Sequence, residues 1–171
     1  MLNGVRQTSR HKGFTLVEAL VAVGVLAVLA SLAAPSFEST FVRFRVRVSA
    51  EGLMSGLQLA RSEALRRNQA VRFTLDDGRG NWSVATLSPA RTIQTSTGAA
   101  AAGVTLTTNT SQTAVVFLAS GLVDTSAARI ERIDLSTRVP GVNTWRVEVH
   151  GGGQVRMCDP AVTDANDRRK C

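Results

Sequence analysis

The chain begins with a polar segment, continues with a long apolar one and then alternates polar and apolar positions in regular patterns. Residues 1–13 are polar, and from Phe14 to Ala34 the only charged residue is Glu18. Apolar side chains continue to Phe37. As a helix, this run spans roughly 30 Å, which is enough to cross the hydrocarbon core of a bilayer. The pattern predicts a membrane-spanning helix over 14–37.

Basic side chains precede the apolar run, because residues 1–13 contain Arg6, Arg10 and Lys12 and no acidic residue. Basic flanks of membrane helices stay in the cytoplasm. We therefore expect the rest of the chain on the other side of the membrane, which in a bacterium is the periplasm.

A stripe of apolar side chains follows Pro35, at steps of three and four residues in a polar background. This is one face of an amphipathic helix, predicted over 38–70 and packed on a sheet on one side only. A coiled-coil seam would show the same stripe, but this one is too short for that to be preferred. A proline inside a helix removes a backbone donor and clashes with the preceding turn, so we expect a kink at Pro35. The stripe consists of Val42, Val46, Ala50, Leu53, Leu57, Ala60 and Ala64.

After Asn68 the apolar positions recur every second residue, which is typical of strands. The segments 71–75 and 82–87 predict a hairpin with a long turn. Residues 94–103 are small and polar and predict a flexible connection. One long helix followed by an antiparallel sheet is an α+β arrangement, with the sheet covering the helix stripe. Further strands are predicted over 104–108, 113–118, 130–135, 144–150 and 154–158.

The composition is basic, with 20 Lys and Arg against 13 Asp and Glu and a formal charge of +7. Nearly all the basic residues are arginines, which favour phosphate contacts and would suit nucleic acid or anionic lipid. A G+C-rich genome would produce the same bias. Composition alone therefore identifies no partner.

The apolar run has two interpretations. An ordinary secretory signal would be cleaved near Ser31, Leu32 and Ala33. Glu18 argues against this interpretation, because a carboxylate in the middle of a membrane helix costs about 2.5 to 3.5 kcal/mol and usually has a partner or a function. The run also begins directly after Gly13, with no turn-forming residue in between, and flows into the next helical pattern.

Residues Gly13-Phe14-Thr15-Leu16-Val17-Glu18 resemble the cleavage and methylation motif of type IV pilins and type II secretion pseudopilins. The resemblance implies that a prepilin peptidase cleaves after Gly13 and that Phe14 becomes N-methylated. It also implies that Glu18 pairs with the terminal amine of a neighbouring subunit. Glu18 lies four residues after Phe14, about 6 Å along a helix, so a neighbour displaced by that much would align amine with carboxylate.

The second half of the chain resembles the minor pilins and pseudopilins grouped as GspH and FimT. The segments that carry this resemblance are 59–64, Val116 and Phe117 with Gly121, and 153–156. The resemblance implies a pilin fold and a non-catalytic structural subunit of a type IV pilus or a type II secretion pseudopilus, which assembles with other pilins through the N-terminal helix. The expected divisions are a cleaved leader (1–13), an apolar helix in the inner membrane (14–37), its amphipathic continuation (38–70) and an antiparallel β domain with a C-terminal cysteine loop (71–171).

The two cysteines, Cys158 and Cys171, lie near the C-terminal end. In an oxidising compartment they can form a disulfide worth roughly 3 kcal/mol, whereas elsewhere they would be two surface thiols. The compartment decides between the two, and the expected C-terminal loop is the one closed by these cysteines.

The sequence shows no pattern typical of an enzyme, a metal site or a cofactor site. His150 is the only histidine after the leader, and its simplest interpretation is an exposed strand residue. No nucleophile elbow, phosphate loop or zinc-ligand spacing is present. Asp159, Asp164 and Asp167 carry calcium-type ligands, but their spacing fits no established loop. We therefore predict no catalysis and no cofactor.

DNA binding is the alternative function. Some FimT-type pilins bind DNA during natural transformation, and the resemblance places a Gly-Arg-x-Arg motif at the last strand. Here that segment runs from Gly153 to Arg156 and lacks the first arginine. Arg168, Arg169 and Lys170 would have to compensate, since such affinity grows with the number of phosphates neutralised. A third alternative is a tethered domain that never polymerises.

Overall fold

The structure is a computed structural model, and it describes residues 14–171 except 77 and 99. Side chains are not described over 32–38. The predicted leader, Gly13 and the Pro35 side chain therefore lie outside the described residues, and the kink at Pro35 stays a prediction.

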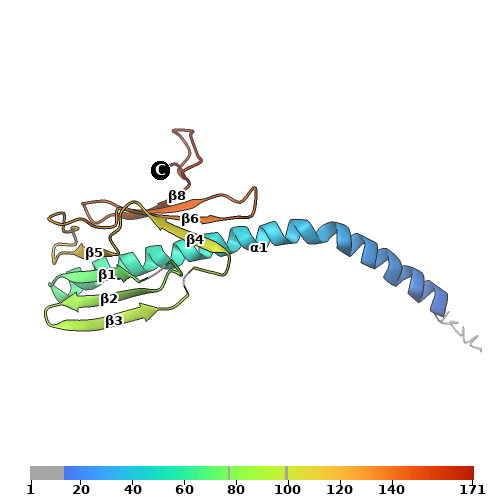
Figure 1. Cartoon of the computed structure of the whole chain (residues 1–171), viewed down its shortest axis with the longest axis horizontal. Coiled ribbons are helices and arrows are strands. Elements are labelled where there is room, and N and C mark those ends of the chain that lie inside the picture. The colour runs from blue at the N-terminus through green and yellow to red at the C-terminus, as the bar shows by residue number, and fades with distance from the viewer. Residues whose placement is uncertain (1–13, 77, 99) are drawn as a thin grey trace, which may run out of the picture. The chain divides into compact units, whose positions relative to one another are not determined.

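The described chain forms one long helix followed by strands (Figure 1). It divides into two compact units, Met1–Phe37 and Glu38–Cys171, which we describe separately. None of the helical segments described here is both long and apolar enough to cross a membrane. The elements are α1 (Leu16–Arg67), β1 (Val71–Leu75), β2 (Trp82–Leu87), β3 (Ala90–Ser96), β4 (Val104–Thr108), β5 (Ala114–Phe117), β6 (Arg132–Thr137), β7 (Trp145–Val149) and β8 (Val155–Cys158).

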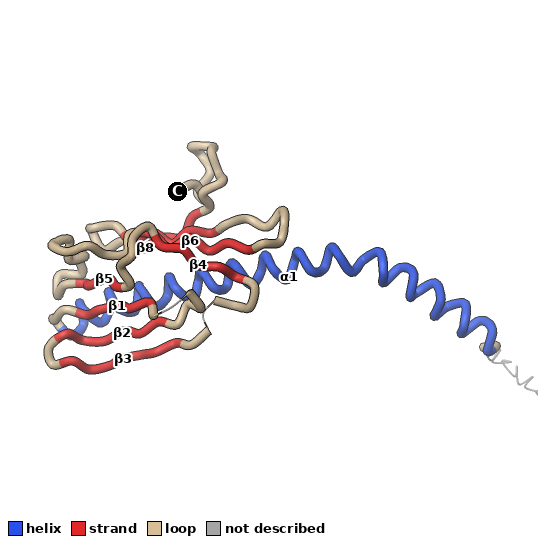
Figure 2. The backbone as a smooth tube through the Cα atoms, viewed as in Figure 1, coloured by secondary structure: helices blue, strands red, loops and turns tan. Residues whose placement is uncertain are grey.

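The strands of the second unit form two antiparallel sheets (Figure 2). One has the order β3-β2-β1-β5 and the other the order β4-β6-β7-β8. The predicted hairpin is β1–β2, in which Val71 lies opposite Thr86 and Leu75 opposite Trp82. The predicted α+β class is confirmed, although the strands divide between two sheets where a single sheet was expected.

The core of the second unit lies between the α1 stripe and the inner faces of both sheets. The predicted stripe residues from Val46 to Ala64 are fully buried, and Val42 packs against the same cluster. Phe73 and Phe117 come from one sheet, and Ile133 and Val147 from the other. The three-and-four spacing therefore identified the buried face of the helix correctly.

The prediction of a flexible connection over 94–103 is wrong for its first residues, because β3 extends to Ser96. This strand lies at the edge of its sheet and is mostly exposed, and only Ile93 packs against the core. An edge strand exposed on both faces has no need for alternating apolar residues, so period two is absent.

The C-terminal end of α1 carries a cluster of charges that stabilises its last turn. Asn68 ends the helix with a φ of 52°, a conformation common at helix ends. Arg66 Nη2 and Arg67 Nε donate to Glu63 Oε2 over 2.7 Å and 2.6 Å. These hydrogen bonds lower the pKa of Glu63 from 4.5 to about 2.

We expect this cluster to make stability pH-dependent in acid. The folded-state pKa of Glu63 is depressed, so its contribution is complete above pH 4.5 and is lost as the pH falls towards about 2. The loss should be about 1 kcal/mol, as for a partly exposed ion pair. Urea unfolding of wild type and E63Q at several acidic pH values measures it. E131Q is the control and should follow wild type, whereas an identical pH dependence in E63Q would contradict the assignment.

Candidate functional site

The first turn of α1 contains the residues of the predicted processing and assembly motif that the structure describes. Thr15 precedes the helix, and its Oγ1 accepts a hydrogen bond from the Glu18 backbone N–H over 3.2 Å. Thr15 and Glu18 thus have the spacing of a capping box, and the acid lies at the positive end of the helix dipole. The Glu18 side chain is exposed and forms no ion pair with any residue that the structure describes. Its carboxylate is available to a partner.

The apolar side chains of the first unit are exposed along the helix. Phe14 is 86% exposed, and Val25, the most covered of the large apolar side chains up to Leu29, is 54% exposed. Contiguous apolar surface of this kind marks a protein or membrane interaction site. The helix therefore presents an exposed apolar surface beside a carboxylate that has no ion-pair partner among the residues described.

The three segments that carry the GspH and FimT resemblance meet at one place, which we call the glycine junction: Arg61, Gly121 and Gly153. Arg61 Nε, from α1, donates to the Gly121 carbonyl oxygen over 3.2 Å. Gly153, in the β7–β8 turn, lies so close that a Cβ there would overlap the same oxygen. Both glycines have positive φ, 77° at Gly121 and 78° at Gly153. The junction joins α1 to the ends of both sheets, so these residues have a structural explanation.

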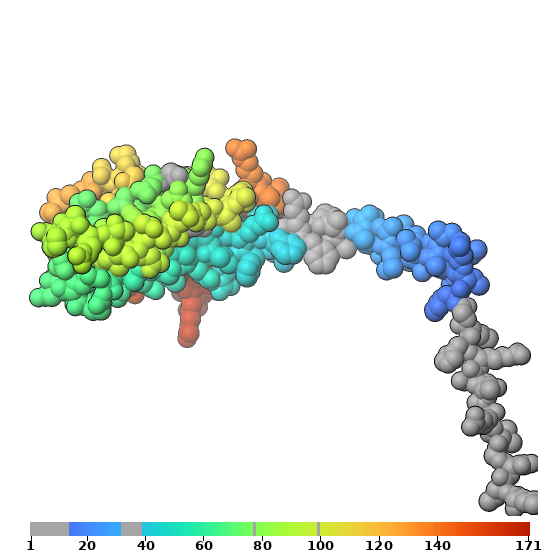
Figure 3. All heavy atoms as spheres, turned by 90° about the horizontal axis from the view of Figure 1, so that it is seen from below, coloured from blue at the N-terminus to red at the C-terminus, as the bar shows by residue number. Residues whose placement is uncertain are grey.

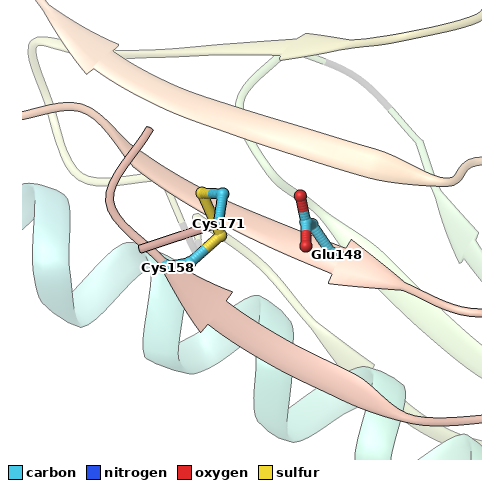
Figure 4. A group of neighbouring side chains, drawn as sticks. All are labelled: Glu148, Cys158 and Cys171. Atoms are coloured by element: carbon cyan, nitrogen blue, oxygen red, sulfur yellow. A yellow bond between two sulfur atoms is a disulfide. The ribbon is translucent and has the colours of Figure 1, made fainter. Parts of the chain in front are cut away.

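The C-terminal loop is closed in two ways. Cys158 and Cys171 form the predicted disulfide (Figure 4). Arg156 lies nearby on β8, where its Nε donates to Glu148 Oε2 over 3.3 Å and its Nη2 to the Lys170 carbonyl oxygen over 3.2 Å. The loop is thus held by a covalent bond and by an arginine that bridges it to β7.

A buried carboxylate holds the start of the same loop. Asp159 is 1% exposed, and its Oδ2 accepts from Asn143 Nδ2 over 2.8 Å. Its Oδ1 accepts from the Ala161 backbone N–H over 2.9 Å. One of the three aspartates considered for calcium is therefore part of the packed structure.

Removal of the disulfide should destabilise the second unit. The bond closes a loop with a sequence separation of 13, and such a constraint on the unfolded chain is worth about 3 kcal/mol. Denaturant unfolding of the full chain in detergent should show this loss in the C158S/C171S variant, and reduced wild type should match it. A difference in unfolding free energy below about 1 kcal/mol between variant and wild type would show that the disulfide does not restrict the conformations of the unfolded chain.

The four cations predicted for DNA are close together but mostly engaged. Arg156 bonds to Glu148 and Lys170, as described above. Arg169 Nη2 lies 2.7 Å from Asp167 Oδ2, and this pairing lowers the pKa of Asp167 to about 2. Lys170 Nζ donates to the Thr163 carbonyl oxygen over 3.2 Å. Arg168 is exposed and has no ion pair within the described part of the chain.

Possible metal ligands gather at one place in the residues described. Glu148, Cys158 and Cys171 have ligand atoms within 4.8 Å of one another (Figure 4). A thiolate is the sulfur species that binds metals, and here both sulfurs are joined in the disulfide. The aspartates considered for calcium bond elsewhere, Asp164 to the Asn166 backbone and Asp167 to Arg169. His150 is 51% exposed, with its Nε2 3.6 Å from Glu148 Oε2.

One feature was not predicted from the sequence. A groove lies between α1 and the start of β7, and it contains Arg43, Phe44, Arg47, Val142 and Trp145. We call it the arginine groove. The local signal was the alternation of arginines with large apolar residues over 41–48. Its partners across the groove are about 100 positions away along the chain, which local periodicity does not reveal.

Comparisons with known proteins agree with this geometry. The family model described as type II transport protein GspH matches residues 49–153, and that of the prokaryotic N-terminal methylation motif matches residues 8–34. No curated protein matches the chain in sequence.

Two solved structures share the fold. The type IV minor pilin FimU of Pseudomonas aeruginosa is 20% identical, with a TM-score of 0.59 over 71% of this chain and 97% of FimU. The minor pseudopilin EpsH of the Vibrio cholerae type 2 secretion system is 18% identical, with a TM-score of 0.55 over 69% of this chain and 99% of EpsH. The methylation motif, the GspH match and the fold point the same way, and the chain belongs to the GspH family of minor pilins and pseudopilins.

Proposed function

We propose that the chain is a non-catalytic minor subunit of a type IV pilus or of a type II secretion pseudopilus. The observation that carries this proposal is the methylation-motif match over 8–34, which coincides with an exposed apolar helix and with Glu18 in its first turn, a residue without an ion pair in the described part of the chain. Cleavage by a prepilin peptidase between Gly13 and Phe14 frees the Phe14 amine, which becomes N-methylated. Glu18 of one subunit then pairs with the freed amine of the next.

The same proposal assigns a location. Residues 14–37 anchor the precursor in the bacterial inner membrane, with the basic leader in the cytoplasm and the β domain in the periplasm. The disulfide Cys158–Cys171 is consistent with such an oxidising compartment. On assembly, the exposed apolar side chains exchange lipid for the helices of neighbouring subunits, in head-to-tail contacts that generate open filaments.

DNA uptake has less support as the function of this chain. Three of its four candidate cations, Arg156, Arg169 and Lys170, already bond within the protein. Phosphate contacts would have to replace those bonds, which lowers the gain from each contact. NMR titration of the full chain with duplex DNA, with shifts at Arg168 and its neighbours, would restore this alternative.

A photo-crosslinking amino acid at Ala22 tests assembly against simple tethering. Ala22 is exposed in the middle of the apolar helix, so a probe there leaves the domain core intact. We expect crosslinks to other pilin-family subunits under conditions in which filaments form. The control is a probe at Ser83, on β2 of the domain, which should give fewer such products. Recovery of the Ala22 variant only as a monomer would support the tethered domain instead.

A further inference from the structure

The arginine groove combines two guanidinium groups with an apolar lining. Arg43 and Arg47 are one helical turn apart on α1 and so lie on the same face. Trp145 and Val142 line the opposite side and pack partly against the core. The groove lies wholly within the unit Glu38–Cys171. In Figure 3 the helical residues from 40 onward, in cyan, lie at the surface of this unit.

Both guanidinium groups are held in position by the protein. Arg43 Nη2 donates to the Gly141 carbonyl oxygen over 2.8 Å. The Arg47 guanidinium lies 5.9 Å from the centre of the Trp145 ring, and its Nε donates to Glu51 Oε1 over 2.9 Å. An arginine has five N–H donors, so these contacts leave donors on each group for an anion. The site is thus one arginine bonded to a neutral carbonyl and one paired with a carboxylate, both above an apolar surface.

The surroundings of the groove have the character of a membrane interface. Phe41 is 62% exposed and Phe44 67% exposed, and both lie on the same stretch of helix as the exposed Arg45. No acidic residue occurs from 39 to 50, and the next residue, Glu51, is the one that pairs with Arg47. Aromatic side chains gather at the level of lipid headgroups, and arginines beside them attract anionic lipids.

We propose that the arginine groove binds the phosphate headgroup of an anionic phospholipid in the membrane leaflet that faces the domain. Arg43 and Arg47 contact the phosphate, while Phe44 and Trp145 contact the glycerol and the upper acyl chain. The inference rests on the proposed membrane anchor, because the stretch of exposed phenylalanines and arginines begins at Phe41, only four positions after the apolar run ends at Phe37. The bound lipid would keep the domain of the precursor at the membrane surface until the subunit leaves the membrane during filament assembly.

The arrangement favours lipid over a protein or nucleic-acid ligand. A bidentate arginine suits phosphate, and the exposed phenylalanines beside it need an apolar environment that a DNA backbone does not supply. Arg43, Arg45 and Arg47 follow closely after the proposed anchor, where anionic headgroups attract basic side chains.

The test uses the full chain in two steps. Flotation with phosphatidylcholine liposomes first measures the anchor without any anionic lipid. Native mass spectrometry from detergent then compares binding of phosphatidylglycerol with that of phosphatidylcholine of the same acyl chains. We expect a preference for phosphatidylglycerol, weakened roughly 20-fold in R43Q/R47Q. The matched control R72Q/R91Q removes the same charge from exposed positions on β1 and β3 and should keep the preference.

Two further measurements locate the lipid. With 5-fluorotryptophan, the ¹⁹F resonance of Trp145 should shift on addition of phosphatidylglycerol, whereas that of the buried Trp82 should not. R43K/R47K keeps both charges and should retain more binding than R43Q/R47Q, which guards against a folding defect.

The outcomes distinguish failure of the proposed function from failure of this inference alone. A chain that fails to float refutes the membrane anchor, and with it both the proposed function and this inference. A chain that floats but binds both lipids equally refutes only the proposed lipid site. The same holds if R72Q/R91Q loses as much phosphatidylglycerol binding as R43Q/R47Q, or if the ¹⁹F resonance of Trp145 does not shift. Crosslinks from Phe44 to a second pilin subunit, without any lipid preference, would make the groove a protein interface.

Discussion

Replacement of Gly153 by alanine is expected to destabilise the second unit by about 3 to 5 kcal/mol, which is at the upper end for a single substitution. Gly153 has a φ of 78°, a conformation that L side chains rarely adopt. An added Cβ would also overlap the Gly121 carbonyl oxygen and approach Arg61 Nε at 3.1 Å. A local shift of the Gly153 backbone would not remove the overlap, because the oxygen belongs to a different turn. Backbone strain and steric overlap therefore both destabilise the variant.

Denaturant unfolding of the full chain in detergent measures this effect, and Gly152 provides the control. A Cβ at Gly152 would meet nothing within 4 Å, and its φ is not in the left-handed region. G152A should therefore stay within about 0.5 kcal/mol of wild type. If G153A and G152A unfold alike, the glycine junction does not hold the helix and the two sheets together.

Replacement of Glu18 by valine should leave the protein in the membrane and reduce its incorporation into filaments roughly 100-fold. Loss of one partner of a buried ion pair costs about 3 kcal/mol or more, because the other charge stays behind without compensation. In the filament that remaining charge would be the amine of the neighbouring Phe14. Valine also lengthens the apolar run, so membrane retention should not fall.

Quantification of the subunit in purified filaments and in the membrane fraction measures both effects. E131Q, on the exposed loop before β6, removes an equal charge and should assemble normally. Equal amounts of E18V and wild type in the filaments would refute the pairing of Glu18 with a neighbour's amine.

The sequence predicted those elements that bury one face only, because their apolar residues then recur with the period of the helix or strand. The stripe from Val46 to Ala64 has the helical period because one side of α1 packs on the core. Val147 and Val149 alternate with polar residues because β7 is buried on one face only. The end of α1 was predicted within three residues and each end of β7 within one.

The rest depends on contacts that local patterns do not report. β3 has no buried face and hence no period. Gly121 and Gly153 could be noticed only through a family resemblance. Their close approach, which leaves no room for a Cβ at Gly153, joins two turns that are far apart in the chain. The pairing of Arg156 with Glu148 and the Lys170 carbonyl was also invisible, although the register of β7 and β8 brings Glu148 opposite Arg156.

Intact-mass and N-terminal fragment mass spectrometry of the mature protein show where the chain is cleaved. We expect a polypeptide that starts at Phe14 and carries one methyl group on its α-amine. A polypeptide that starts after Ala33, or one that retains residues 1–13 in assembled filaments, would contradict this expectation.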